Sequence, residues 1–151
     1  MLRSLLIGLS AGSRSMTPLA AVSEAASGGH LPRDSGAPPW LGRPWFATGA
    51  KVLAAGELWG DKLPSAPDRN ALAGVLARVV TGGLAGAALA PRRQWMIGGA
   101  IGAGAAVAAA YVTFHLRMRA MRRFGQTSTG LVEDALTVGA AQLATRALPQ
   151  N

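Results

Sequence analysis

Two carboxylates follow an apolar run in the stretch "GELWGDKLPSAPDR", residues 56–69. Glu57 and Asp61 are four residues apart, so on a helix both side chains lie on one face. Paired carboxylates on a membrane helix can hold a cation, accept a transported proton or neutralise an arginine. The alternative is that the helix ends near Gly60 and that Asp61 and Lys62 are solvated charges at the membrane surface.

A second polar stretch, "GSRSMTP" at 12–18, lies within an apolar segment. Arg14 is about ten residues into that segment, near the middle of a bilayer at ~1.5 Å per residue. A lone arginine at that depth costs at least ~2.5 kcal/mol unless it is paired or faces water. Thr17 is close by, and Pro18 disrupts a helix by freeing a backbone carbonyl. The stretch predicts a polar, broken segment; alternatively the helix is short or tilted and Arg14 extends to the membrane surface.

Three further charged residues interrupt apolar segments. Arg78 is the single charge in 72–90. Glu133 and Asp134 follow "TSTG", where carboxylates favour the positive end of a helix dipole. For at least one of these two carboxylates, that structural role is the preferred interpretation.

Five apolar segments must position these side chains. Their ranges are 4–26, 45–63, 72–90, 94–116 and 130–148, with loops near 28–44, 64–71, 91–93 and 117–129. The clearest segment, 94–116, contains no Asp, Glu, Lys or Arg over about the ~20 residues that cross a bilayer. Trp95 lies at one end of it, and Tyr111 and Phe114 lie towards the other, as interfacial aromatics would. The alternatives are a buried core helix here and a signal peptide at the N-terminus, although Arg14 cuts that apolar run short.

The composition agrees with a membrane protein of one domain, residues 1–151. Half of the residues are hydrophobic and 15% are charged, against about 25% charged in soluble domains. Glycine accounts for 20 of the 151 residues, which suits close helix contact in lipid. The chain has no cysteine, which excludes disulfides, thiolate metal sites and a cysteine nucleophile. We expect no cofactor.

Glycine pairs with GxxxG spacing occur on four of the segments. They are Gly8/Gly12, Gly56/Gly60, Gly82/Gly86 and Gly98/Gly102. Four such pairs favour a tightly packed bundle, and Gly-rich faces are also candidates for a homo-oligomer. The alternative is chance matches in a glycine-rich chain.

The net charge is +8, but nucleic acid is not an expected partner. The densest basic run, "RMRAMRR" at 117–123, directly follows the most apolar segment, as the positive-inside rule describes. With a cytoplasmic N-terminus and five spans, seven basic residues are inside and five outside. The inside set is Arg3, Lys62, Arg69, Arg117, Arg119, Arg122 and Arg123, and the outside set is Arg33, Arg43, Arg92, Arg93 and Arg146. The small excess predicts a cytoplasmic N-terminus.

The two halves of the chain show a faint similarity. "RSMTPLA" at 14–20 resembles "RVVTGGLA" at 78–85, and an acidic residue follows each, Glu57 and Glu133. Repeats of this kind build transporters whose site lies between the halves. The predicted fold class is therefore an all-α, polytopic membrane helix bundle of about five spans with two weakly similar halves.

Three motifs in order, "GSRSMTPLA", "GELWGDKLPSAPDR" and "LVEDAL", resemble a family of bacterial integral membrane proteins grouped as domain of unknown function 4126. The resemblance covers nearly the whole chain. It implies an integral membrane protein and supplies no activity. We expect a multi-pass protein of the bacterial inner membrane. Separately, Glu57, Gly60, Asp61 and Lys62 are similar to the Glu-x-Gly-Asp-Lys/Arg motif of a family of cation/proton exchangers, with the glutamate one residue further from the glycine.

The leading functional hypothesis is a small transporter or channel with a polar intramembrane site for a small ion or a proton-coupled solute. Its candidate pathway residues are Arg14, Thr17, Glu57, Asp61, Arg78, Glu133 and Asp134. The alternative is a structural or partner-binding membrane subunit in which the same charges form buried pairs between helices. An enzyme is not expected, because His30 and His115 lie in a loop and at a span end, and no nucleophile–base constellation is visible.

Overall fold

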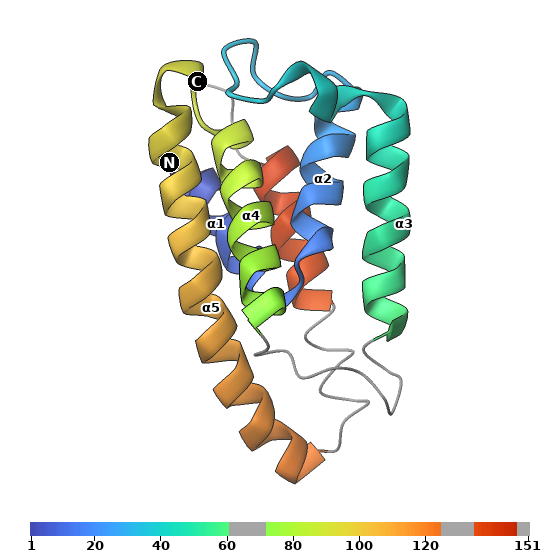
Figure 1. Cartoon of the computed structure of the whole chain (residues 1–151), viewed down its shortest axis with the longest axis vertical. Helices are drawn as coiled ribbons and strands as arrows, with labels where there is room; N and C mark the ends of the chain where they lie inside the picture. Colours follow the sequence, from blue (N-terminus) through green and yellow to red (C-terminus); the bar gives the residue numbers. More distant parts are fainter. Residues whose placement is uncertain (61–71, 125–134, 148–151) are drawn as a thin grey trace.

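The computed structural model describes residues 1–60, 72–124 and 135–147 (Figure 1), and this part of the chain is helical without a named strand. The α-helices are α1 (Leu2–Ser13), α2 (Met16–Ser27), α3 (Pro44–Gly60), α4 (Leu72–Leu89) and α5 (Trp95–Phe124). Two short 3-10 helices, η1 (Pro39–Gly42) and η2 (Arg92–Gln94), lie between them. Residues 135–142 form a further helix that continues into a π-helical turn, η3 (Leu143–Ala147). We refer to residues 135–147 as the last helix. The all-α fold class is confirmed.

The helices alternate in direction. Helices α1, α3 and α5 run downwards in Figure 1, whereas α2, α4 and the last helix run upwards. Contacts agree with these directions, because Gly8 lies against Gly102 and Gly12 against Ala106, so α1 is parallel to α5. We call the end with residues 28–44 and 90–94 the upper end. The opposite end, with residues 13–15, is the lower end.

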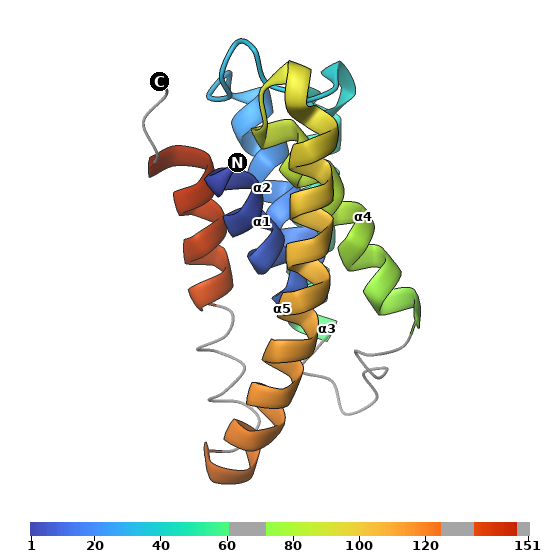
Figure 2. The same ribbon diagram turned by 90° about the vertical axis from the view of Figure 1, so that its left-hand side faces the viewer.

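The predicted single span 4–26 is wrong, although the predicted break within it is confirmed. Arg14 is extended, with φ −138° and ψ 119°, and it ends α1. Helices α1 and α2 then lie side by side as a hairpin, as both views show (Figure 2). Each has 12 residues, or ~18 Å, which is short of the ~30 Å hydrocarbon layer. Pro18 falls in the first turn of α2, where its missing N–H breaks no intrahelical bond.

The remaining boundaries agree with the sequence except in one loop. Helices α3 and α4 and the last helix lie within the predicted ranges 45–63, 72–90 and 130–148 to within a few residues. The predicted loop 117–129 is wrong at its start, because α5 continues to Phe124. Arg, Met and Ala are good helix formers, and basic residues stabilise a helix C-terminus. The predicted loop 64–71 lies outside the described residues.

Glycine and alanine form the contact between α1, α4 and α5. A Cβ atom added at Gly12 would lie 2.6 Å from the carbonyl oxygen of Ala106, and one at Gly86 would lie 2.9 Å from the Cα of Gly102. The hydroxyl of Ser4 donates a buried hydrogen bond of 2.9 Å to the carbonyl oxygen of Gly86. Gly12 and Gly86, each a member of a GxxxG pair, therefore lie at helix crossings, as expected for the tightly packed bundle that this spacing favours. Only glycine permits backbones to approach this closely.

Gly56, in the GxxxG pair on α3, does not lie at a helix crossing in the described part of the chain. A Cβ atom at Gly56 would meet nothing within 4 Å among the atoms considered around it, and this residue is exposed on α3. Small residues on α3 instead contact α2 through another face, where Ala50 and Ala54 pack against Ala20. The GxxxG spacing therefore does not place Gly56 at a contact with another helix in the described part of the chain.

The proposed repeat has no counterpart in local structure. Arg14 has an extended backbone between two helices, whereas Arg78 lies within the continuous helix α4. The threonines also differ, because Thr81 donates a hydrogen bond of 2.9 Å to the carbonyl oxygen of Ala77, whereas the hydroxyl of Thr17 has no hydrogen-bond partner within the described residues. The two stretches share residues but not conformation.

Many large apolar side chains face outwards, while most buried apolar residues are alanines beside a few larger side chains such as Ile7 and Leu41. Alanines such as Ala85, Ala88 and Ala106 are fully buried. In contrast, Val52 is 66% exposed, Met96 68% and Leu136 70%. Within the described residues, one segment, Arg92–His115, is long and apolar enough to cross a membrane. Two shorter apolar helices are Gly74–Leu89 and Ala135–Thr145.

Candidate functional site

The break between α1 and α2 is held by a carboxylate from α3. Glu57 Oε1 accepts hydrogen bonds from the backbone N–H of Ser15 at 2.8 Å and from its hydroxyl at 2.9 Å. Glu57 Oε2 accepts a third hydrogen bond, from the backbone N–H of Met16 at 2.8 Å. Glu57 is half-buried in the last turns of α3. The carboxylate therefore bonds the start of α2.

This arrangement supplies a helix cap from a distant part of the chain. The first N–H groups of a helix have no intrahelical partner, and the helix dipole makes that end positive. Ser15, at the N-cap position of α2, makes no side-chain capping bond of its own. Glu57, 42 residues further along, takes that role with an ionised group. The bonds also tie the lower end of α3 to the hairpin.

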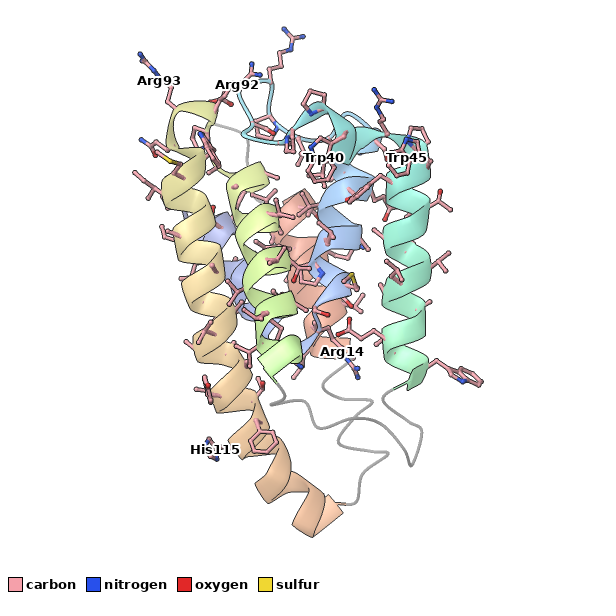
Figure 3. All side chains as sticks on the ribbon, in the orientation of Figure 1. Arg14, Trp40, Trp45, Arg92, Arg93 and His115 are labelled. Carbon is pink, nitrogen blue, oxygen red and sulfur yellow. The ribbon has the colours of Figure 1, made fainter. Side chains whose placement is uncertain are left out.

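Two arginines are buried in the bundle. Arg14 is 2% exposed and stands at the lower end, next to the capped start of α2 (Figure 3). Arg78 is 7% exposed on α4, six residues after the start of that helix, or ~9 Å along its axis. Buried arginines are rare. The polar, broken segment predicted from "GSRSMTP" is thus a compact site in which Arg14, Ser15 and Glu57 lie together.

A cleft of about 230 Å³ lies between α2, α3 and the last helix. It is lined by Thr17, Ala20, Ala21, Glu24, Lys51, Ala54, Ala55, Leu58, Val138 and Gln142. Lys51 Nζ and Glu24 Oε1 form an ion pair of 3.2 Å, with both side chains partly exposed. Two other lining atoms, Thr17 Oγ1 and Gln142 Oε1, are buried and have no hydrogen-bond partner within the described part of the chain.

The predicted site residues do not form one site. Thr17 lines the cleft. Glu57 lies at the turn beside Arg14, and Arg78 is buried on α4 and is not among the residues that line the cleft. The remaining predicted residues, Asp61, Glu133 and Asp134, lie outside the described residues. In the described ranges, no group of three or more His, Cys, Asp or Glu side chains is placed to hold a metal ion.

Sequence reasoning missed three residues of the cleft. Glu24 and Lys51 each interrupt an apolar segment, and this signal could have found them as a pair between neighbouring helices. Gln142 gives no such signal, because a neutral amide in an apolar segment is unremarkable. It directly precedes the π-helical turn η3, a feature that sequence patterns do not reveal.

Comparisons with curated proteins and with solved structures gave no match. A family model does match the chain, over residues 1–149. This range includes both the capped break and the cleft. The chain therefore belongs to the family described as Domain of unknown function (DUF4126).

Proposed function

We propose that this protein is an integral membrane protein whose outer surface lies in lipid. The support is the distribution of side chains, because alanine is the most frequent buried apolar residue while the large apolar side chains of Val52, Met96 and Leu136 face outwards. Large apolar side chains exposed on α3, α5 and the last helix mark a surface that contacts a partner or lipid. In lipid such a surface is solvated, and small interior residues give the close packing that holds helices together.

The positions of aromatic residues fit a bilayer. On α5, Trp95 and Phe114 are 19 residues apart, or ~28 Å along the helix axis. On α3, Trp45 and Trp59 are 14 residues apart, or ~21 Å. The separation on α5 is close to the ~30 Å thickness of the hydrocarbon layer, and the separation on α3 is shorter. Trp45 lies at the upper end with Arg92 and Arg93 (Figure 3), as expected for an aromatic and basic interface.

The hairpin changes the orientation argument. Because α1 runs from the upper to the lower end and the hydroxyl of Ser4 bonds the carbonyl oxygen of Gly86 near the end of α4, Arg3 lies towards the upper end, where Arg92 and Arg93 lie (Figure 3). The sequence-based count had placed Arg3 on the side of the 117–123 run. When Arg3 is counted on the other side, the seven basic residues inside and five outside become six on each side. Basic residues therefore give no preferred orientation, and a cytoplasmic N-terminus loses its support.

We infer that the bundle acts as a small transporter or channel. The observation that carries this inference is the hairpin turn between α1 and α2, where the side chain of Arg14 is buried in an otherwise apolar-surfaced bundle. Ionisable residues within a membrane bundle mark pathways for ions or solutes. The cleft beside α2 supplies space next to this break.

One observation favours a structural membrane subunit as the second candidate. Glu57 already accepts three hydrogen bonds from Ser15 and Met16. A carboxylate engaged in this way stabilises the hairpin and needs no bound cation. In this second role the buried polar groups hold α1, α2 and α3 together, and the protein's partner is another membrane component.

A flux measurement with a buried and an exposed arginine separates the two functions. Purified protein in proteoliposomes is tested for the flux of protons, potassium, chloride and small neutral solutes. The transport function predicts a flux above that of protein-free liposomes. Arg78→Met should lower this flux. Arg92→Met removes an exposed arginine at the upper end and should leave the flux unchanged. Monodisperse elution of each variant in detergent controls for folding. Absence of flux for every solute with folded protein contradicts the transport function.

A further inference from the structure

We propose that the upper end of the bundle binds the phosphate group of an anionic phospholipid through Arg33 and Arg93. This inference rests on the proposed placement of the bundle in lipid and names a lipid partner for one of its ends. The two arginines come from segments far apart in the sequence, and both are exposed. Within the described part of the chain, neither side chain forms an ion pair. Their charges are therefore available to a bound anion.

A short backbone bridge brings these two segments together. Ser35 and Pro91 pair in an antiparallel bridge, and the N–H of Arg92 donates a hydrogen bond to the carbonyl oxygen of the residue before Ser35. In an antiparallel pairing, the residues before one partner lie beside the residues after the other. Arg33 is two residues before Ser35, and Arg93 is two residues after Pro91. The two arginines therefore leave the bridge on the same side.

The segments joined by the bridge carry an excess of positive charge. Three arginines stand against one acidic residue, Asp34, in residues 32–36 and 90–94, which leaves a net charge of +2. The ion pair between Glu24 and Lys51 is closed on itself and does not change this excess. Guanidinium groups bind phosphate oxygens in a bidentate geometry. A phosphate group beside Arg33 and Arg93 therefore offsets the positive charge of the bridge.

Apolar surface directly below the arginines favours a lipid over a soluble anion. Trp95 and Met96 follow Arg93 at the start of α5, and both are exposed. A Cβ atom added at Gly36 would lie 2.8 Å from the Cβ of Trp95, so the bridge packs against this helix start. Figure 3 shows Arg93 at the upper end. Because tryptophan lies at headgroup level, an acyl chain beside Met96 leaves its phosphate group next to the arginines, whereas a soluble phosphate matches the arginines alone.

Quenching by nitroxide lipids tests this partner in proteoliposomes. Because the chain has no cysteine, Gln94→Cys gives a single thiol for a fluorescent label between Arg93 and Trp95. Thr48→Cys gives a control label on the exposed face of α3. Each labelled protein is reconstituted in phosphatidylcholine with the same small fraction of a nitroxide lipid, either phosphatidylglycerol, which is anionic, or phosphatidylcholine, which is neutral.

The label at position 94 should be quenched more strongly by phosphatidylglycerol. Each net positive charge near a membrane surface favours an anionic lipid by roughly fivefold. A net charge of +2 therefore predicts an association constant for phosphatidylglycerol about 10- to 30-fold higher than for phosphatidylcholine at low ionic strength. Salt should reduce this preference, and the two lipids should quench position 48 equally.

The outcomes separate this inference from the placement in lipid. Equal quenching of position 94 by the two lipids overturns the lipid site and leaves the placement standing, because both lipids then reach the label. If neither lipid quenches position 94 or position 48, the placement in lipid is wrong, and the lipid site with it.

Replacing the two arginines tests their assignment. The double variant Arg33→Gln and Arg93→Gln should reduce the preference at position 94 to within about twofold. Arg43→Gln removes another exposed arginine of the upper end and should keep the preference. Monodisperse elution in detergent controls for folding of each variant. A folded double variant that retains the full preference overturns the assignment to Arg33 and Arg93.

Discussion

Replacing Glu57 with glutamine removes the negative charge at the start of α2 but keeps a side chain of the same length. The amide oxygen can still accept the hydrogen bonds that Ser15 donates to Oε1. The amide nitrogen then occupies the place of Oε2 and faces the N–H of Met16. Two donors oppose each other at that point, so one hydrogen bond is lost and the helix dipole loses its anion.

The size of the effect follows from these two losses. A hydrogen bond to a charged group contributes about 1.5–3 kcal/mol, and an anion at a helix N-terminus contributes about 0.3–1 kcal/mol. We therefore expect Glu57→Gln to lower the free energy of unfolding by about 2–3 kcal/mol. Ser15→Ala removes only the bond from the hydroxyl and should cost about 1 kcal/mol.

Reversible unfolding in mixed detergent micelles, followed by circular dichroism, measures both free energies. Glu24→Gln is the matched control, because it also removes a glutamate charge but breaks a partly exposed ion pair on α2, which is worth less than about 1 kcal/mol. If Glu57→Gln is no less stable than Glu24→Gln, the carboxylate does not cap α2 and the explanation of the hairpin is wrong.

Two further predictions concern packing and topology. Gly12→Leu should destabilise the protein by about 3 kcal/mol or more, since even a Cβ there overlaps α5. Gly56→Leu is the control and should change the melting temperature little. Equal melting temperatures of the two variants would contradict close packing at Gly12. Cysteines that replace Leu2 and Ser35 should be labelled from the same side of a sealed membrane, and one that replaces His115 from the other side, because α1 and α2 form a hairpin. Labelling of positions 2 and 35 from opposite sides would restore a single span over 4–26.

Much of the fold follows from local sequence patterns. Apolar segments bounded by proline and polar loops predict α3, α4 and most of α5, because helix formation and its ends depend on nearby residues. GxxxG spacing predicts the crossings at Gly12 and Gly86, where backbone contact admits no side chain. The same spacing at Gly56 fails, because the pattern does not say which helix face meets a neighbour.

The hairpin and the cleft depend on contacts between distant residues. The sequence around Arg14 predicts a break, but a kink and a reversal have the same local pattern. The reversal is held by Glu57 from 42 residues away, a contact that a single sequence does not specify. Likewise, Thr17 and Gln142 come together only because the last helix packs beside α2 and α3.

Spin labels at outward-facing positions test most directly whether the bundle lies in lipid. The labels replace four exposed residues, Leu53, Val80, Val112 and Leu136. In reconstituted bilayers, each label's collision rate is measured with oxygen, which concentrates in the hydrocarbon layer, and with a water-soluble nickel complex. A membrane bundle predicts high oxygen and low nickel accessibility at all four positions. High nickel accessibility at these positions would contradict a lipid-facing surface and, with it, the proposed transport function.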